Sequence, residues 1–187
     1  MGDKQGFRFH GGRPSVNFTA TVGERWRDGG FERLPDPAAL GRWCTEAGLT
    51  PADPACTAAD LVAARELREA VYRLMLGRLS GTAAADEDVA TVNRWAAHPP
   101  PVTALRVTSA GLRAERVPAT VPSLLGLIAA DAVAVLGGGD AARLRECANP
   151  ECSLLFLDTS RAGARRWCSM AACGSRDKMQ RYRAGDR

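Results

Sequence analysis

Histidine, long apolar runs and internal repetition are scarce in this chain of 187 residues. Its two histidines, His10 and His98, lie far apart, and no order of serine, histidine and aspartate suggests a hydrolytic triad, so we expect no enzyme. A run of about 18 apolar residues and a signal peptide are both missing, which predicts a cytoplasmic protein with no membrane partner. Heptads and repeats are missing too, so the pattern favours neither a coiled coil nor a repeat array.

The length and composition fit one ordinary domain followed by a small module. Apolar residues make up 45% of the chain, which is typical of a globular protein. The net charge is +4, but it is spread unevenly. From Arg143 onward ten basic residues face five acidic ones, so this segment carries +5 and the rest carries −1. Such an asymmetry indicates a polyanionic partner for the C-terminal segment.

Four of the six cysteines are concentrated in that basic segment. They form two C-x4-C pairs, Cys147 with Cys152 and Cys168 with Cys173, separated by fifteen residues. Four thiolates satisfy a tetrahedral Zn²⁺ completely, with Zn–S distances of about 2.3 Å and no open position. The pattern therefore predicts one structural zinc ion rather than a catalytic one.

Two disulfides, or four unrelated buried thiols, are the alternatives. Disulfides are disfavoured because no secretory segment precedes the cysteines. Nearby cations, such as Arg165 and Arg166, help to keep thiols ionised. The two remaining cysteines, Cys44 and Cys56, are expected to be buried or idle thiols.

The rest of the chain predicts a mainly α fold with a small β-hairpin, in the α+β class. Apolar periodicity and capping signals predict helices over residues 15–27, 37–47, 57–79, 86–97 and 121–136. Two alternating runs around Ser109-Ala110-Gly111 predict a hairpin near 102–117. The Gly137-Gly138-Gly139 stretch is interpreted as the linker between a domain at 1–139 and a module at 140–187. Asp140 is expected to cap a short helix leading to Cys147, and a last helix is expected over 171–184.

The C-terminal segment resembles the CGNR zinc finger. The resemblance rests on Phe156-Leu157-Asp158-Thr159-Ser160-Arg161, Arg165-Arg166-Trp167-Cys168-Ser169-Met170, Cys173-Gly174-Ser175-Arg176-Asp177-Lys178 and Tyr182-Arg183. One signature residue differs, because Ser175 stands where the family has asparagine, and we expect serine to cap a helix there. The resemblance implies a small treble-clef-like zinc-binding module. Phe156, Trp167 and Met170 are expected to pack around the metal.

The basic residues of this segment are the candidate DNA contacts. Arginine forks bind phosphates and guanine edges, whereas lysine contributes mainly point charge. We expect the last helix and the loop before the second cysteine pair to dock on duplex DNA. The candidate residues are Arg161, Arg165, Arg166, Arg176, Lys178, Arg181 and Arg183. For each arginine, the alternative is that it neutralises the thiolates or keeps the surface hydrated.

The front portion resembles the ABATE domain, which accompanies the CGNR finger in many bacterial candidates for stress-induced transcription regulation. The resemblance rests on the order of elements, on Val16-Asn17-Phe18-Thr19-Ala20-Thr21-Val22 and on Leu40-Gly41-Arg42-Trp43. Asn17 and Ala20 replace an aspartate and an asparagine of the family's early motif, so a ligand site built on those residues would be changed or lost.

Together these resemblances imply a bacterial transcription regulator in which the helical domain senses a ligand or forms a homodimer and the finger binds DNA. A second hypothesis is that the finger contacts a protein or RNA. A third is a small-molecule-binding protein or enzyme with a structural finger. Its pocket, which would also suit an effector of a regulator, is expected near Asn17, Arg25, Trp26 and Trp43.

Overall fold

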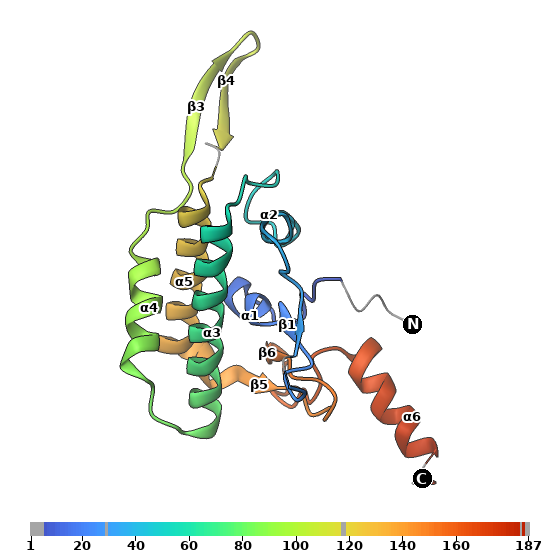
Figure 1. Cartoon of the computed structure of the whole chain (residues 1–187). Helices are drawn as coiled ribbons and strands as arrows, with labels where there is room; N and C mark the ends of the chain where they lie inside the picture. Colours follow the sequence, from blue (N-terminus) through green and yellow to red (C-terminus); the bar gives the residue numbers. More distant parts are fainter. Residues whose placement is uncertain (1–5, 29, 117–118, 184, 186–187) are drawn as a thin grey trace.

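A layer of three long helices forms the body of the molecule in a computed structural model (Figure 1). The described residues are 6–28, 30–116, 119–183 and 185; for Glu115, Arg116 and Arg181 the description covers the backbone. The layer consists of α3 (Ala58–Ser80), α4 (Asp86–Ala96) and α5 (Val121–Gly137). A β-ribbon projects from one end of the layer, and the smaller elements and the C-terminal segment lie on one side of it (Figure 1). This arrangement confirms the predicted mainly α fold.

The ends of α3 show how closely local sequence fixes a helix boundary. Thr57 accepts a hydrogen bond from the Asp60 amide, while the Asp60 carboxylate accepts one from the Thr57 amide, which is a complete capping box. At the other end Gly81 adopts the left-handed conformation with φ of 75°, which glycine reaches without steric cost. Helix α2 (Pro37–Glu46) likewise starts at Asp36, whose carboxylate accepts from the Ala39 amide at 2.7 Å. The predicted starts of both helices are confirmed.

Helices α4 and α5 approach each other closely where the C-terminal end of α4 passes Gly126. A Cβ at Gly126 would lie 3.0 Å from both Cβ and the carbonyl oxygen of His98, and 3.2 Å from the Trp95 carbonyl oxygen. Such contacts are too tight for a side chain without movement of the neighbouring backbone. His98 and Trp95 also stack, with ring centroids 4.8 Å apart. The close spacing of α4 and α5 therefore depends on the absence of a side chain at Gly126.

The first predicted helix is much shorter than expected, and this part of the prediction is wrong. Helix α1 spans Pro14–Thr19, after which the chain turns into the short strand β1 (Val22–Gly23), paired with β2 (Phe31–Glu32). The hydroxyls of Thr19 and Thr21 donate to the carbonyls of Val16 and Phe18, which offers the backbone an alternative to further helical turns. The apolar spacing seen in the sequence reflects burial on both sides of this turn rather than one helical face.

The projecting ribbon is an antiparallel pair, β3 (Thr103–Thr108) and β4 (Gly111–Arg116). Its register pairs Thr103 with Arg116 at the root and Thr108 with Gly111 at the tip. The predicted hairpin is thus confirmed for its described residues, while the predicted end at Val117 lies outside them. All six residues of β3 are exposed.

A second hairpin joins the helical layer to the C-terminal module. After the 3₁₀ turn η1 (Gly139–Arg143), strand β5 (Leu144–Glu146) pairs with β6 (Leu155–Leu157). Strand β5, not the predicted short helix, leads into Cys147, and Gly138 rather than Asp140 precedes the 3₁₀ turn. Leu144, Leu155 and Leu157 of this hairpin belong to the core under the helices, so the two strands cover one side of it.

The two sides of β6 face two different apolar clusters. Leu155 and Leu157 belong to the core under the helices, whereas Leu154 and Phe156 belong to a small cluster around the cysteines. This alternation is the period-2 side-chain pattern of a strand with both faces buried. Strand β6 is further tied to the front of the chain, because the Leu157 amide donates to the Gly11 carbonyl at 2.9 Å. Strand β6 therefore contributes side chains to both clusters.

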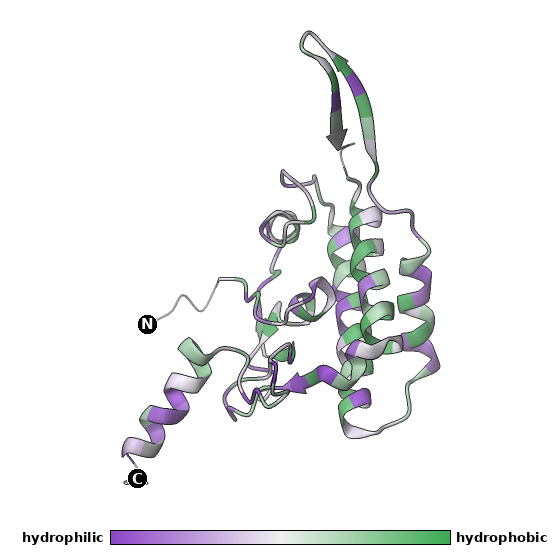
Figure 2. Ribbon diagram, turned by 180° about the vertical axis from the view of Figure 1, so that it is seen from behind, coloured by the Kyte–Doolittle hydropathy of each residue, from purple (hydrophilic) through white to green (hydrophobic). Residues whose placement is uncertain are grey.

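The chain ends in a π-helical turn, η2 (Met170–Gly174), and the helix α6 (Ser175–Arg183). Figure 2 shows α6 as largely hydrophilic beyond its first turn, in contrast to the apolar α5. Ser169, not Ser175, caps the turn by accepting a hydrogen bond from the Ala172 amide; the Ser175 hydroxyl instead donates to the Met170 carbonyl. The expected capping role of Ser175 is thus wrong, and the predicted end of the helix at Ala184 lies outside the described residues. Among the helices described, none is both long and apolar enough to span a bilayer.

Candidate metal centre and its surroundings

The Sγ atoms of Cys147, Cys152, Cys168 and Cys173 lie within 4.8 Å of one another. The Cys152–Cys168 and Cys168–Cys173 distances are both 3.7 Å. A tetrahedron with Zn–S bonds of about 2.3 Å has an edge of about 3.8 Å, so these separations fit a single ion. A disulfide would need about 2.05 Å, and all six cysteines are free. The four cysteines fit one structural Zn²⁺, as predicted.

The first cysteine pair sits in the tight turn between β5 and β6. The Cys147 amide donates to the Leu154 carbonyl, and the Cys152 amide donates to the Asn149 carbonyl. The side-chain oxygen of Asn149 also accepts from the Glu151 amide at 2.9 Å, which closes an Asx turn beside Pro150. These bonds bring both sulfurs to the same side of the turn.

The second pair lies at the start of the C-terminal helix. Cys168 precedes the π-helical turn and Cys173 lies within it, two residues before the start of α6. The Cys168 amide points at the Cys147 sulfur, with N–S of 3.4 Å. A zinc-binding turn from a hairpin and a second pair at a helix N-terminus together form the treble-clef-like arrangement that was predicted. The positive end of the helix dipole lies close to the thiolates and stabilises them.

The thiols compete for protons in the absence of a cation. Hydrogen bonds with Cys152, Cys168 and Cys173 lower the pKa of Cys147. Hydrogen bonding to Cys147 is the main reason that the pKa values of Cys152 and Cys168 are raised. All four groups can be deprotonated together only if a positive ion compensates their charge, which is what Zn²⁺ supplies.

Around the sulfurs, Phe156 and Trp167 pack as predicted, but Met170 does not. Phe156 is fully buried in the cysteine cluster, and Trp167 packs against it while partly buried. The Met170 side chain is 64% exposed, and its sulfur lies against the Cα of Gly174, where a Cβ would be only 2.8 Å away. The prediction that Met170 is part of this packing is wrong because the π-helical turn directs it outward.

Asp158 holds the loop between the two cysteine pairs. Its carboxylate accepts hydrogen bonds from the Ser160 amide, the Ser160 hydroxyl and the Arg165 amide. The hydrogen bond from the Ser160 hydroxyl is the largest cause that lowers the pKa of Asp158. This gives a physical role to the aspartate and serine of the F-x-D-x-S-R pattern: they shape the loop that delivers Cys168.

Arg165 serves the metal centre rather than the surface. Its guanidinium donates to the carbonyl of Trp167 at 2.8 Å and to that of Cys168. It also lies over the Phe156 ring, 4.5 Å from the centroid. Both carbonyls belong to the segment that carries the third ligand, so Arg165 fixes that segment and brings a positive charge close to the thiolates.

Five of the other predicted cations of this segment are exposed to solvent. These are Arg161, Arg166, Arg176, Lys178 and Arg183. Arg166 also lies over the Trp167 ring at 5.0 Å from its centroid. The side chain of Arg181 lies outside the described part of the chain. The structure thus separates one arginine that supports the fold from five cations available to a partner.

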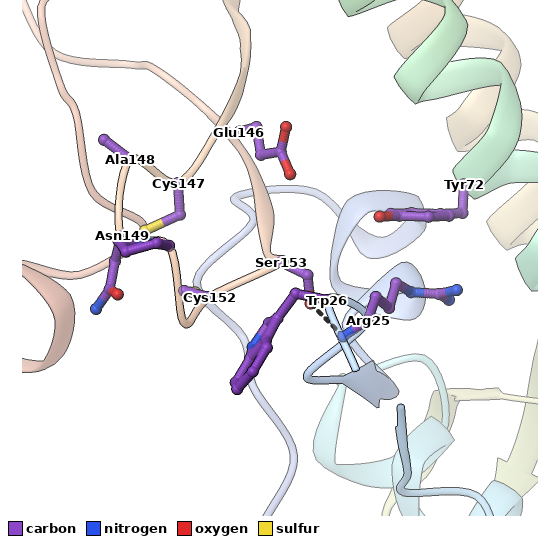
Figure 3. Close-up of a pocket in the computed structure, with 10 residues that line it drawn as sticks. Arg25, Trp26, Tyr72, Glu146, Cys147, Ala148, Asn149, Cys152 and Ser153 are labelled. Atoms are coloured by element: carbon purple, nitrogen blue, oxygen red, sulfur yellow. Dashed lines mark hydrogen bonds between the residues drawn. The ribbon is translucent and has the colours of Figure 1, made fainter. Parts of the chain in front are cut away.

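The predicted pocket residues are not brought to one place. Trp43 is fully buried against Phe18 in the helical core, and the Asn17 side chain accepts a hydrogen bond from the Gly11 amide at 2.8 Å. Of these four residues, Arg25 and Trp26 line a cavity of about 240 Å³, which lies between the helical layer and the first cysteine pair (Figure 3). Asn17 and Trp43 are structural, because Trp43 belongs to the helical core and the Asn17 side chain binds the Gly11 backbone.

The walls of this cavity come from elements far apart in the sequence. The Arg25 guanidinium pairs with Glu69 at 2.8 Å and lies 3.8 Å from the centroid of the Tyr72 ring, while its amide donates to the Ser153 hydroxyl. The further lining residues are Glu146, Cys147, Ala148, Asn149, Pro150 and Cys152. Sequence reasoning missed Tyr72, Glu146 and Asn149 because the cavity forms only when the finger docks, and no local pattern records that docking.

Comparison with known families agrees with this two-part arrangement. Residues 12–139, more than half of the chain, match the ABATE family, described as "Putative stress-induced transcription regulator". The chain belongs to the ABATE family. Residues 143–185 match the CGNR zinc finger, so both resemblances found in the sequence are confirmed. A search of curated proteins finds no match. The ABATE part therefore supplies the helical layer, and the CGNR finger supplies the metal centre.

Proposed function

We propose that this protein is a cytoplasmic bacterial transcription regulator whose CGNR finger binds duplex DNA. The observation that carries the proposal is the separation of charges in the finger. Arg165 donates its hydrogen bonds to carbonyls beside the metal site. The exposed cations include Arg161, Arg166, Arg176 and Lys178. The description of the ABATE family as a stress-induced regulator supports the same reading.

The exposed helix α6 is the element best suited to enter a groove of DNA. It projects from the body of the molecule beyond the metal centre (Figure 1), and Arg176 and Arg183 are seven residues apart, two helical turns on one side. An α-helix fits the major groove of B-DNA, where arginine reads guanine edges and phosphates. The finger's net charge of +5 would draw it to the duplex and favour phosphate contacts.

The zinc ion has a structural role in this proposal. Four cysteines fill its coordination sphere, so no position is left for an activated water, and we propose a binding protein rather than an enzyme. The ion fixes the start of α6 relative to β6, and β6 is anchored in the helical core. The recognition helix would then be held in a defined orientation on the ABATE part.

The salt dependence of DNA affinity tests the proposal. The double variant Arg176→Ala/Arg183→Ala should bind more weakly and lower the slope of log K against log salt by about 1 to 2, because each lost phosphate contact removes roughly one released counterion. The matched control is Arg42→Ala/Arg94→Ala, which removes the same charge from exposed positions on α2 and α4.

Fluorescence anisotropy with random-sequence duplex DNA measures these slopes for the zinc-loaded protein. Equal slopes for the wild type and the Arg176/Arg183 variant would remove α6 from the interface. Equal losses in both double variants would mean that only net charge matters. Selection from random DNA and random RNA then identifies the polymer, and enrichment of RNA alone would favour an RNA-binding finger instead.

A second candidate function is effector binding in the cavity of Figure 3. The cavity is lined by an arginine, a tyrosine and the carboxylate of Glu146, which suits a small molecule that carries both charges. An occupant would touch both the ABATE part and the turn that holds two zinc ligands. Calorimetry with the free amino acids, compared between the wild type and Glu146→Gln, tests this; the absence of heat in every titration would count against it.

A further inference from the structure

The projecting ribbon β3–β4 has one apolar face and one polar face. The register pairs Leu105 with Ala114 and Val107 with Leu112, and paired residues in an antiparallel ladder share a face. Ala104, Arg106, Thr108 and Arg113 alternate with them and occupy the opposite face. We call the face formed by Leu105, Val107, Leu112 and Ala114 the ribbon face.

The ribbon face is open to solvent. Leu105 is 73% exposed, Val107 85% and Leu112 72%. The ribbon stands clear of the helical layer in Figure 1. Two-stranded ribbons are marginally stable in water unless a face is covered, and contiguous apolar surface of this kind marks an interaction site. The regular alternation of apolar and polar residues is what a strand needs when one of its faces is buried.

A second apolar surface lies at the other end of the helical layer. It is a groove of about 370 Å³ between α3, α4 and α5, and we call it the helical groove. Val133 and Val89 in it are 44% and 38% exposed. Its other lining residues are Leu74, Arg78, Thr82, Ala84, Val92, Asn93, Leu136 and Gly137. The volume is about two and a half times that of a 150 Å³ cavity that holds benzene, so it suits roughly two or three aliphatic side chains.

A chain cannot fill its own helical groove with its own ribbon. The ribbon leaves the layer between the C-terminal end of α4 and the start of α5, whereas the groove lies around the loop from α3 to α4 and the end of α5, at the opposite end (Figure 1). A second copy, turned antiparallel beside the first, places each ribbon at the other copy's groove. We propose that this protein forms a two-fold dimer in which each copy inserts its ribbon face into the helical groove of the other.

The area of the ribbon favours this exchange over direct pairing of two ribbons. Two strands of six residues cover about 20 Å by 10 Å, so two ribbons face to face would bury only about 400 Å² in total. Specific interfaces usually bury at least about 1,200 Å². Two reciprocal ribbon–groove contacts bury about 800 Å² because the exchange occurs twice, and contacts between the helical layers would have to supply the remaining area of about 400 Å².

Charge also favours the exchange. Ribbon residues 103–116 carry three arginines and one glutamate, a net charge of +2. The segment around the groove carries Arg78 together with Asp86 and Glu87 of the first turn of α4, a net charge of −1. Because Arg106 and Arg113 lie on the face opposite the ribbon face, this attraction would act at the rim of the groove rather than inside it.

Two single substitutions with matched controls test the dimer. Val107→Asp places a charge on the ribbon face, and Val133→Asp places one in the helical groove. Ala104→Asp adds the same charge to the opposite face of the ribbon, and Ala134→Asp adds it to an exposed neighbour on α5 outside the groove. Sedimentation velocity of the zinc-loaded protein over a concentration series measures the dimer Kd. Far-UV circular dichroism and zinc content verify that each variant is folded.

We expect the Val107 and Val133 variants to raise the dimer Kd by at least about tenfold, and the controls to change it by no more than about twofold. A mixture of the two variants should dimerise more tightly than either alone, since the mixed dimer keeps one intact ribbon–groove contact. A wild type that is monomeric throughout, controls as damaging as the variants, or a mixture no tighter than its components would each overturn the proposal. Pairing of two ribbons would give the last of these results, because every mixed dimer would contain an altered ribbon.

Discussion

The ABATE part and the CGNR finger bury very different material. Among the described residues, the core beneath the helices contains 24 buried apolar side chains, three of them from the finger. The cluster around the zinc ligands contains six, of which three are cysteines and one, Ala20, comes from the ABATE part. The helical core has enough apolar surface to hold itself together, and the finger has not. The finger compensates with a metal ion and with β6, whose other side belongs to the helical core. A small module can thus be stabilised by packing against a neighbouring domain as well as by a metal ion.

Removal of zinc should have the largest effect, because it should unfold the finger and leave the helical part folded. A structural zinc ion contributes about 10 to 16 kcal/mol of apparent binding free energy, so Cys168→Ser or chelation should unfold residues 158–183. The helices α1 to α5 should stay folded, because none of the four zinc ligands belongs to their core. Limited proteolysis and far-UV circular dichroism measure the two parts together.

Cleavage by trypsin after Arg161 or Arg166, with most of the helical signal retained, is the expected pattern. The control is Cys56→Ser, a cysteine outside the metal centre. Loss of the helical signal at the same chelator concentration would show that the two parts form one cooperative unit.

Substitutions of adjacent residues in β6 can separate the stability of the helical core from that of the finger, because these residues face different clusters. Leu155→Ala should cost about 2 to 5 kcal/mol of stability in the helical part and leave zinc affinity nearly unchanged. Phe156→Ala should cost about 3 to 5 kcal/mol, mainly in the finger, and weaken zinc retention. Urea unfolding, followed by circular dichroism and by a zinc-sensitive dye, separates the two effects. Identical profiles for both variants would contradict the assignment of one face to each cluster.

The smallest expected effect is a pH dependence confined to the finger. The hydrogen bond from Ser160 lowers the pKa of Asp158 in the folded state. The carboxylate therefore adds stability that is fully present above its unfolded pKa of about 3.9 and is lost as the pH falls through the lower, folded value. Asp158→Asn should release zinc more readily at neutral pH.

The gap between the wild type and Asp158→Asn should then shrink as the solution is acidified, and zinc release against pH measures it. The control is Glu151→Gln in the first cysteine turn, an exposed carboxylate. A gap that is constant with pH would show that the Asp158 charge is not what holds the loop.

Much of the fold could be predicted from local signals. The capping box at Thr57, the Asp36-Pro37 start and the glycine at 81 fix helix ends through bonds within a few residues, so they are visible in the sequence. The cysteine spacing predicted the metal centre for the same reason. The turn at Val22 could not be predicted from apolar spacing, because the local hydroxyl bonds of Thr19 and Thr21 act together with the pairing of β1 with the more distant β2.

The candidate site divides in the same way. The four ligands follow from spacing, whereas the different roles of Arg165 and Arg166, adjacent in sequence, depend on which carbonyls lie nearby in three dimensions. The chemical type of Trp43 predicts a pocket residue, yet its side chain fills the core beside Phe18. Residue type alone does not distinguish a buried aromatic from one that lines a cavity.

The close contact at Gly126 influences the direction in which the β3–β4 ribbon projects. The ribbon begins after the end of α4 and returns to the start of α5, so its root is hinged on the two segments that meet at this glycine. We expect a methyl group there to displace His98 and so to change the direction of the outgoing strand, with the largest displacement at the tip of the ribbon. The orientation of the exposed ribbon thus depends in part on the absence of a side chain at Gly126, between α4 and α5.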